Sequence, residues 1–325
     1  MKKWSLNLIC CPKCRGKLDL KESQTQEAEV IAGTLACQAC GKTFAIDSGV
    51  PRLVVNPSKR KRLAENWGYQ WTKMTEGKLE TETYYGDTED EEAGNFFRSF
   101  GISPAGMTGK KVLDVGCGHG RLIRALGGYG AQVIGIDIAT SIDRIYGYCQ
   151  MEPDVDIIQA DLETPPFPDA SFDYVSSKLS LCYVSQPEAA FKVLARLIRP
   201  GGRFFISMPD RADPAFTVRL KNSLRFTHHV PVWLLFYISW GLAPFLWAGR
   251  KLSRKSGTSL RTNVFLLFNA LHTRFSRHTN EEIVAWFGRA DFNEVIAIPG
   301  SLHSINVMGV KSPPSPQPNS NLYQT

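Results

Sequence analysis

Three short apolar segments, each carrying an aspartate at or near its end, most strongly constrain the fold of this chain. They cover residues 110–115, 132–137 and 155–161, with the acids Asp114, Asp137 and Asp161. Short apolar runs of this kind are typical of buried parallel strands. Apolar runs at 172–175 and 203–207, with a helical pattern over 187–197 between them, continue the alternation. We therefore predict a doubly wound α/β fold that binds its ligand at the carboxyl ends of the strands.

A glycine-rich turn, Gly116-Cys117-Gly118-His119-Gly120, separates the first predicted strand from a helical pattern that starts near Arg121. Glycines permit positive φ and a close approach of ligand to backbone. A dinucleotide fingerprint would place its third glycine at position 121, where this chain has arginine. Asp114 would repel a pyrophosphate but can hold an amino group. The turn therefore favours a cationic nucleoside cofactor over a dinucleotide.

The two later acids fit the same cofactor. Asp137 ends the second predicted strand, where a carboxylate can accept hydrogen bonds from both hydroxyls of a ribose. Asp161 ends the third and is suited to accept a hydrogen bond from an adenine amino group. Together these acids and the glycine turn predict a site for S-adenosylmethionine, which carries an ammonium and a sulfonium but no phosphate.

Two C-x-x-C pairs lie in the first fifty residues: Cys11 with Cys14, and Cys37 with Cys40. Two such pairs complete a tetrahedral set of soft sulfur ligands, which suits Zn²⁺. Four protein ligands leave no open position, so we expect a structural zinc ribbon rather than a catalytic metal. We expect Cys10 to lie outside the ligand set.

The motif run CPKCRGKL…LACQACGKTFAIDSGVPRLV, over roughly residues 6 to 55, resembles the zinc ribbon of the small protein that partners and activates several tRNA and protein methyltransferases. In that family the ribbon binds a partner and stabilises it. Here it is fused to the chain that follows.

The run of strands and acids resembles the class I S-adenosylmethionine-dependent methyltransferases, particularly those with a zinc ribbon in front and a W-G-Y-Q-W element, here Trp67 to Trp71, between. The resemblance covers about residues 6–310. The resemblance implies a seven-stranded, mostly parallel sheet and S-adenosyl-L-methionine as cofactor. The cofactor positions that it implies are Asp114, Gly116, Gly118, Gly120, Asp137, Asp161 and Leu162. Such enzymes commonly carry a Leu-His-His segment after the fourth strand, where this chain has Leu181-Cys182-Tyr183.

The predicted organisation has four parts: a zinc ribbon over 1–57, a linker with cap helices over 58–108, the methyltransferase domain over 109–310, and a disordered tail over 311–325. The basic run Lys59-Arg60-Lys61-Arg62 is interpreted as an exposed part of the linker. At the end of the domain, Thr279 and Glu282 have the spacing of a capping box that begins a helix.

The segment 211–278 is an insert with eleven Lys or Arg and one acid, which gives it a charge of +10. Its residues 230–249 carry no charge and are rich in Trp and Phe. Pro231, Gly241 and Pro244 argue against a simple membrane span. Two interpretations stay open: a lid of helices over the acceptor pocket, and an element within 225–255 that lies on a membrane surface. So long an apolar run favours a membrane over nucleic acid as the partner.

The sequence thus predicts methyl transfer from S-adenosylmethionine to a small, lipophilic acceptor. Tyr183 and His278 are the candidates for a general base. One alternative is an RNA methyltransferase that uses the ribbon for RNA or partner binding, since some rRNA guanine methyltransferases also place a zinc finger before this fold. Another is a binding module without activity. The C-x-x-C pairs and the lack of a signal-peptide pattern at the start predict a cytoplasmic setting, with peripheral attachment to the inner face of a membrane left open.

Overall fold

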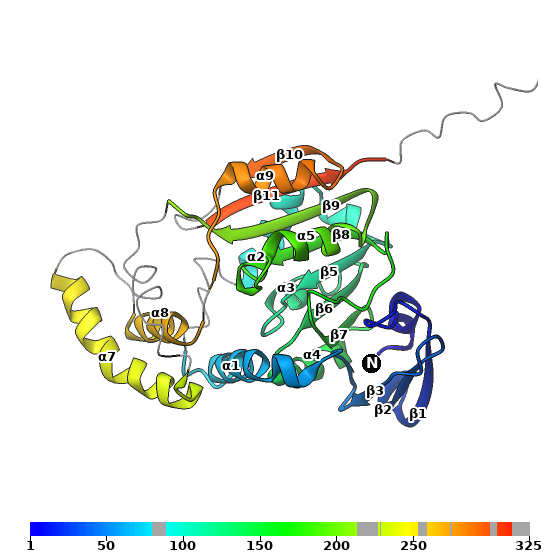
Figure 1. Cartoon of the computed structure of the whole chain (residues 1–325), viewed down its shortest axis with the longest axis horizontal. Helices are drawn as coiled ribbons and strands as arrows, with labels where there is room; N and C mark the ends of the chain where they lie inside the picture. The colour runs from blue at the N-terminus through cyan, green and yellow to red at the C-terminus, as the bar shows by residue number, and fades with distance from the viewer. Residues whose placement is uncertain are drawn as a thin grey trace, which may run out of the picture.

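One continuous sheet connects the cysteine-rich N-terminal segment to the rest of the chain (Figure 1). The computed structural model describes residues 1–79, 89–212, 227, 229–252, 259–273, 275–299 and 304–313. Along the sheet, the strands are β1 (Leu18–Gln26), β2 (Glu29–Cys37), β3 (Thr43–Asp47), β4 (Val50–Leu53), β7 (Val155–Ala160), β6 (Gln132–Asp137), β5 (Lys111–Val115), β8 (Phe172–Lys178), β9 (Ile198–Pro209), β11 (Ser304–Lys311) and β10 (Phe292–Ile298).

The seven strands from β7 to β10 form the doubly wound sheet that the sequence predicts. Strands β7, β6, β5, β8 and β9 run parallel. At the edge, β11 pairs antiparallel with β9 and β10 pairs antiparallel with β11, so β11 alone among the seven strands runs in the opposite direction. Four of the five residues of β5 and five of the six residues of β6 are buried. Both faces of these strands are covered, which is why their sequences are continuous apolar runs instead of alternating patterns.

Helices cover the two faces of this sheet in separate groups. They are α2 (Glu89–Phe100), α3 (Arg121–Ala125) and α4 (Asp143–Met151) on one face, and α5 (Pro187–Ala195) and α9 (Asn280–Gly288) on the other. Short 3₁₀ helices connect the larger elements: η1 (Lys3–Leu8), η2 (Pro104–Met107), η3 (Thr140–Ile142) and η4 (Leu181–Tyr183). Thr279 and Glu282 form the expected capping box at the start of α9.

The four strands of the ribbon extend the sheet at the β7 edge. Strand β4 pairs parallel to β7, with Leu53 opposite Ala160. The N-terminal segment adds side-chain contacts, because the backbone N–H of Lys2 and the hydroxyl of Ser5 both donate to Asp156 of β7, at 2.9 and 2.6 Å. The ribbon is therefore joined to the doubly wound domain through backbone pairing, which the sequence did not predict.

Helix α1 (Pro57–Thr75) crosses from the ribbon to the insert, where it meets α7 (Val232–Leu252) and α8 (Leu260–His272). A third apolar cluster joins the three helices and includes Trp67, Trp71, Phe236 and Phe268. Figure 1 shows α7 and α8 at the opposite end of the molecule from the ribbon. The positions Arg225, Arg254 and Lys255, and most of the predicted tail, lie outside the described residues.

Among the described residues, one helical stretch has the length and composition of a membrane span. It is Val232–Gly249 in α7, with a mean hydropathy of 1.4, and 22% of it is buried inside the protein.

Candidate functional site

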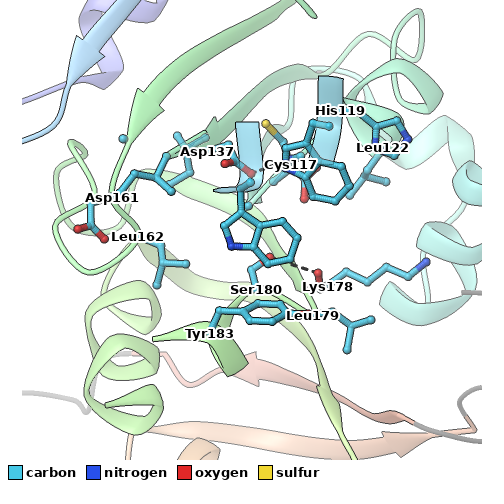
Figure 2. Close-up of a pocket in the computed structure, with 18 of the residues that line it drawn as sticks. Cys117, His119, Leu122, Asp137, Asp161, Leu162, Lys178, Leu179, Ser180 and Tyr183 are labelled. Atoms are coloured by element: carbon cyan, nitrogen blue, oxygen red, sulfur yellow. Dashed lines mark hydrogen bonds between the residues drawn. The ribbon is translucent and has the colours of Figure 1, made fainter. Parts of the chain in front are cut away.

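A pocket opens at the carboxyl ends of β5, β6, β7 and β8 (Figure 2). Its lining includes six of the seven predicted cofactor positions: Asp114, Gly116, Gly118, Asp137, Asp161 and Leu162. Gly120 is not part of this lining. It takes a φ of +81° at the start of α3, where an added Cβ would lie 2.6 Å from Cγ2 of Ile145. Gly120 therefore shapes the turn without lining the pocket.

The first two glycines of the turn are required by the side chains that crowd them. Gly116 and Gly118 have φ of +75° and +58°, which side chains rarely adopt. A Cβ at Gly116 would lie 2.2 Å from Oγ of Ser180, and one at Gly118 would lie 2.9 Å from the Trp71 ring. The turn thus leaves its backbone open to a ligand because no side chain fits there.

Asp137 is held in place by the turn beside it. Its Oδ2 accepts from the backbone N–H of Gly118 at 2.9 Å, and its Oδ1 accepts from the N–H of Ala139 at 2.7 Å. Burial raises the pKa of Asp137, and these two N–H groups oppose that shift. Each oxygen keeps a lone pair for a further donor, so the carboxylate can receive a vicinal diol such as that of a ribose.

Asp114 is a buried acid of the pocket with a strongly raised pKa. Burial raises its pKa from 3.8 to about 8, and the nearby carboxylates of Glu92 and Asp137 act in the same direction, while the Lys178 ammonium opposes them. A cationic group brought next to this carboxyl would favour its ionised form and lower its pKa.

Asp161 lies at the end of β7 and carries a partner from helix α1. The Nε of Arg60 donates to its Oδ2 at 2.6 Å, and the backbone N–H of Glu163 donates to its Oδ1 at 3.0 Å. The Arg60 guanidinium also pairs with the Glu163 carboxylate. The expectation that the basic run of residues 59–62 is a solvated linker is therefore wrong for Arg60, which is in helix α1 and lines the pocket.

Aromatic side chains form another wall of the pocket. Trp67 stacks on Trp71, with ring centroids 5.3 Å apart, and meets the edge of Tyr183 at 4.7 Å. His119 of the glycine turn stacks on Trp71 at 5.4 Å. Figure 2 shows Tyr183 and Ser180 across the cavity from Asp137 and Cys117. An apolar, ring-lined space thus adjoins the group of buried acids.

Charged residues that the sequence did not single out also gather here. Glu92 of α2 is 6% exposed and pairs with Arg121 at 3.5 Å and with Lys178 at 3.2 Å. Glu92, Arg121 and Lys178 all line the pocket. Glu92 belongs to a stretch whose composition is typical of an acidic solvated face, and only the sheet topology brings it to β8.

The structure separates the two candidates for a general base. Tyr183 lines the pocket, but His278 does not. The Nδ1 of His278 lies 3.1 Å from Oε2 of Glu282, its Nε2 lies 3.1 Å from Oγ of Ser276, and its ring meets the edge of Trp286. His278 thus packs at the start of α9 and does not line this pocket, so the structure does not bring the two candidates together.

The four predicted zinc ligands come together at the tip of the ribbon. One sulfur from each of Cys11, Cys14, Cys37 and Cys40 lies within 4.8 Å of the other three. Cys10 is buried and is not a member of the group. Four thiolates from two tight turns fit a tetrahedral structural zinc. Since all four positions are taken by protein, the metal would leave no place for a substrate.

Comparison with known proteins identifies two regions. Residues 113–206 match the family described as a methyltransferase domain, and residues 3–49 match the family described as Trm112p-like protein. Among curated relatives, the ubiquinone biosynthesis O-methyltransferase of Xanthomonas oryzae pv. oryzae is 32% identical over 133 residues, 38% of this chain and 56% of that protein. The same enzyme of Paracidovorax citrulli is 36% identical over 130 residues, 38% of this chain and 52% of that protein. The chain thus spans about half the length of the curated relatives it matches.

Similar solved structures include magnesium protoporphyrin IX methyltransferase from Synechocystis, with a TM-score of 0.48, 15% identity, and coverage of 79% of this chain and 99% of that one. The complex of the Haloferax volcanii Trm112 methyltransferase activator with a methyltransferase has a TM-score of 0.43 and 16% identity, covering 69% of this chain and 90% of that one.

The fold and the pocket define an α/β protein with a doubly wound sheet and a pocket at the carboxyl ends of its central strands. With the two family matches, this chain carries a class I S-adenosylmethionine-dependent methyltransferase domain, preceded by a Trm112p-like zinc ribbon with its group of four cysteines.

Proposed function

We propose that this protein transfers the methyl group of S-adenosylmethionine to a small, lipophilic acceptor. The observation that carries the proposal is a pocket in which three buried acids and an aromatic wall adjoin. The acids suit the cofactor and the aromatic wall suits an apolar acceptor. The matched curated relatives are named as O-methyltransferases of ubiquinone biosynthesis, which supports an acceptor of this class.

Three carboxylates would hold the cofactor in this pocket. Asp114 would receive its ammonium, Asp137 its ribose hydroxyls and Asp161 its adenine amino group. The ammonium would favour the ionised form of the buried Asp114 carboxyl, and the open backbone at Gly116 and Gly118 leaves room for the cofactor beside it. When bound, the cofactor supplies a methyl group on a sulfonium, which an acceptor nucleophile displaces.

The protein's own contribution to such a displacement is mainly alignment. Trp67 and Tyr183 would position an apolar ring, and the Tyr183 hydroxyl is the remaining candidate to take or orient a proton of the acceptor. Trp67 belongs to an apolar cluster with residues of α7 and α8, and His272 of α8 meets its ring at 5.6 Å. This cluster would keep water from that side of the pocket.

The test uses purified protein with S-adenosylmethionine labelled in its methyl group, incubated separately with a lipid-soluble cell extract and with total RNA. We expect label in the lipid-soluble fraction for the wild type and none for Asp137→Ala. Mass spectrometry of the labelled compound then identifies the acceptor. Label that enters RNA alone would replace this proposal with the RNA methyltransferase alternative.

A second variant separates positioning from folding. Tyr183→Phe keeps the ring contact with Trp67 and removes only the hydroxyl. We expect it to bind S-adenosylhomocysteine as the wild type does and to lower kcat for a hydroxyl acceptor by about 10²-fold, the lower range for a general base. An unchanged kcat would restrict Tyr183 to packing.

A further inference from the structure

The outward face of helix α7 consists of apolar and small residues from one end to the other. Its exposed large side chains are Trp233, Leu234, Tyr237, Ile238, Leu242 and Phe245, with exposed fractions of 52, 37, 62, 38, 49 and 76%. We call these six residues the α7 face. They form two adjacent rows, Trp233 with Tyr237 and Leu234 with Ile238, Leu242 and Phe245, in which successive members are three or four residues apart, so they lie along one side of the helix. Gly241, Pro244, Ala248 and Gly249 are the other exposed positions on that side.

A helix on the surface of a soluble protein normally exposes charged and polar residues. Between Trp233 and Gly249 no residue is charged. At 1.5 Å per residue, this stretch of helix is roughly 25 Å long. An exposed apolar surface of this length is unusual for a monomer and marks an interaction site.

The opposite side of α7 is part of the protein core. Leu235, Phe236, Ser239 and Ala243 are at most 3% exposed, and Phe236 meets the edge of the Phe268 ring on α8, with centroids 5.6 Å apart. To cross a membrane, α7 would have to leave these contacts. The helix can instead present its outer face to a bilayer while it lies parallel to the bilayer surface.

Charge and residue type indicate what covers the α7 face. The insert that contains it carries +10 from residues 211–278, and Arg250 and Lys251 stand in the last turn of the helix. Trp233 and Tyr237 have ring systems that favour the boundary between headgroups and acyl chains. Apolar side chains in the plane and basic residues in the flanking sequence suit anionic headgroups.

We propose that the α7 face docks the protein on the surface of an anionic lipid bilayer, with α7 in the plane of the interface. Docking would bring the apolar cluster around Trp67, and hence the pocket next to it, close to the phase in which a lipophilic molecule dissolves. The docking itself does not depend on the proposed acceptor, and it can be measured with neither cofactor nor acceptor present.

The test is cosedimentation of the full-length, zinc-loaded protein with vesicles of phosphatidylcholine alone and of equimolar phosphatidylcholine and phosphatidylglycerol. We expect the wild type to bind the anionic vesicles at least about tenfold more tightly than the neutral ones, with binding weakened by salt. The variant Trp233→Ser/Tyr237→Ser/Phe245→Ser should lose about tenfold or more of this affinity.

The matched control is Met151→Ser/Ile296→Ser, which removes two large apolar side chains that are 73 and 51% exposed elsewhere on the protein. It should bind vesicles as the wild type does. Both variants should keep a melting temperature close to that of the wild type, because every replaced side chain is more than half exposed. Both should also keep the wild-type affinity for S-adenosylhomocysteine, because none of these residues lines the pocket.

Three results would overturn the proposal. One is wild-type protein that fails to bind anionic vesicles, and another is equal loss of binding in the triple variant and in the control. The third is a wild type that sediments as a dimer in the ultracentrifuge and becomes a monomer in the triple variant without binding vesicles. In that case a second copy of the chain, and not lipid, covers the α7 face.

Discussion

Replacing Asp114 by asparagine should make the empty protein more stable while it weakens binding of the cofactor. The carboxyl of Asp114 is 5% exposed, and its pKa is raised to about 8. In the unfolded chain the same group loses its proton near 3.8. Below that pH the acid is protonated in both states and burial imposes no proton-linked penalty.

The penalty grows between the two pKa values. As the pH rises from 3.8 towards 8, the unfolded chain releases this proton and the folded protein retains it, so the free energy of unfolding falls by about 1.4 kcal/mol per pH unit. At pH 7 the interval is 7 − 3.8 = 3.2 pH units, or about 4 kcal/mol. Above pH 8 the penalty no longer changes with pH.

Asparagine is nearly isosteric and never ionises, so Asp114→Asn removes this penalty. It still buries an amide, which costs about 1–3 kcal/mol. The expected net gain at pH 7 is therefore about 1–3 kcal/mol, which raises the melting temperature by roughly 2–10 °C. The gain should shrink as the pH is lowered towards 4.

Thermal unfolding of the cofactor-free protein across this pH range measures the stability effect. Calorimetry with S-adenosylmethionine measures the effect on cofactor affinity. Loss of a charge-assisted hydrogen bond should weaken binding by about 10- to 100-fold. The control is Asp154→Asn, at an exposed position that precedes β7. A variant that melts lower than the wild type at pH 7, or a difference that is the same at pH 5 and pH 8, would refute the reasoning.

Three further perturbations test other parts of the structure. Asp161→Ala should weaken S-adenosylhomocysteine binding by about tenfold in calorimetry, but leave the affinity for the analogue with inosine in place of adenosine unchanged, and equal losses for both ligands would contradict the assigned contact. Gly49→Ala should lower the melting temperature by the equivalent of about 2 kcal/mol or more, because Gly49 has a φ of +78° and a Cβ there would lie 2.0 Å from Cζ of Tyr146. Gly147→Ala, where nothing lies within 4 Å, is its control and should be neutral or stabilising. Cys14→Ser, or a chelator, should lower the first unfolding transition, and only the chelated wild type should recover on addition of zinc.

The acids of the pocket could be predicted because each one lies at or next to the end of its strand in the sequence. The apolar run that ends in Asp137 predicts both a strand and its last residue. Because neighbouring strands are parallel, their carboxyl ends lie at the same edge of the sheet. The same logic placed the capping box at Thr279, where the partner is three residues away. Contacts between residues so close in the chain can be predicted from the local sequence.

The sequence around Arg60 contains a helical pattern that predicts its place in the pocket, although the basic run was interpreted as an exposed linker. Pro57 takes the first position of α1, and Arg60 is on the same helix face as Leu63, Trp67 and Trp71, at steps of three, four and four residues. A basic run after a proline therefore carried a helical pattern directed into the pocket. The positive charge of the run does not distinguish the two interpretations, since Lys59, Lys61 and their neighbours suit an exposed linker equally well.

His278 lies outside the pocket for a reason that the local sequence does not contain. The sequence places it at the end of the insert, but how the insert folds back decides whether it reaches the pocket. In the structure the start of α9 binds it instead, through Glu282 one turn later. Glu92 is the reverse case, because α2 brings an acid from an apparently solvated stretch against Lys178. In both cases the sequence shows the chemistry of the side chain, but it does not show where the chain places that side chain in the fold.

The pairing of β4 with β7 had no signature in the sequence, because parallel pairing between distant segments uses backbone groups that every residue carries. Its consequence is nevertheless specific. Without the ribbon, β7 would be an exposed edge strand. With it, Leu53 pairs with Ala160, the residue before Asp161, and α1 then delivers Arg60 to the same carboxylate. The zinc site therefore stabilises a strand whose last residues belong to the cofactor pocket. We therefore expect loss of zinc to destabilise the part of the pocket around Asp161 first. The glycine turn should be affected later, because β5 and β6 hold it in the centre of the sheet.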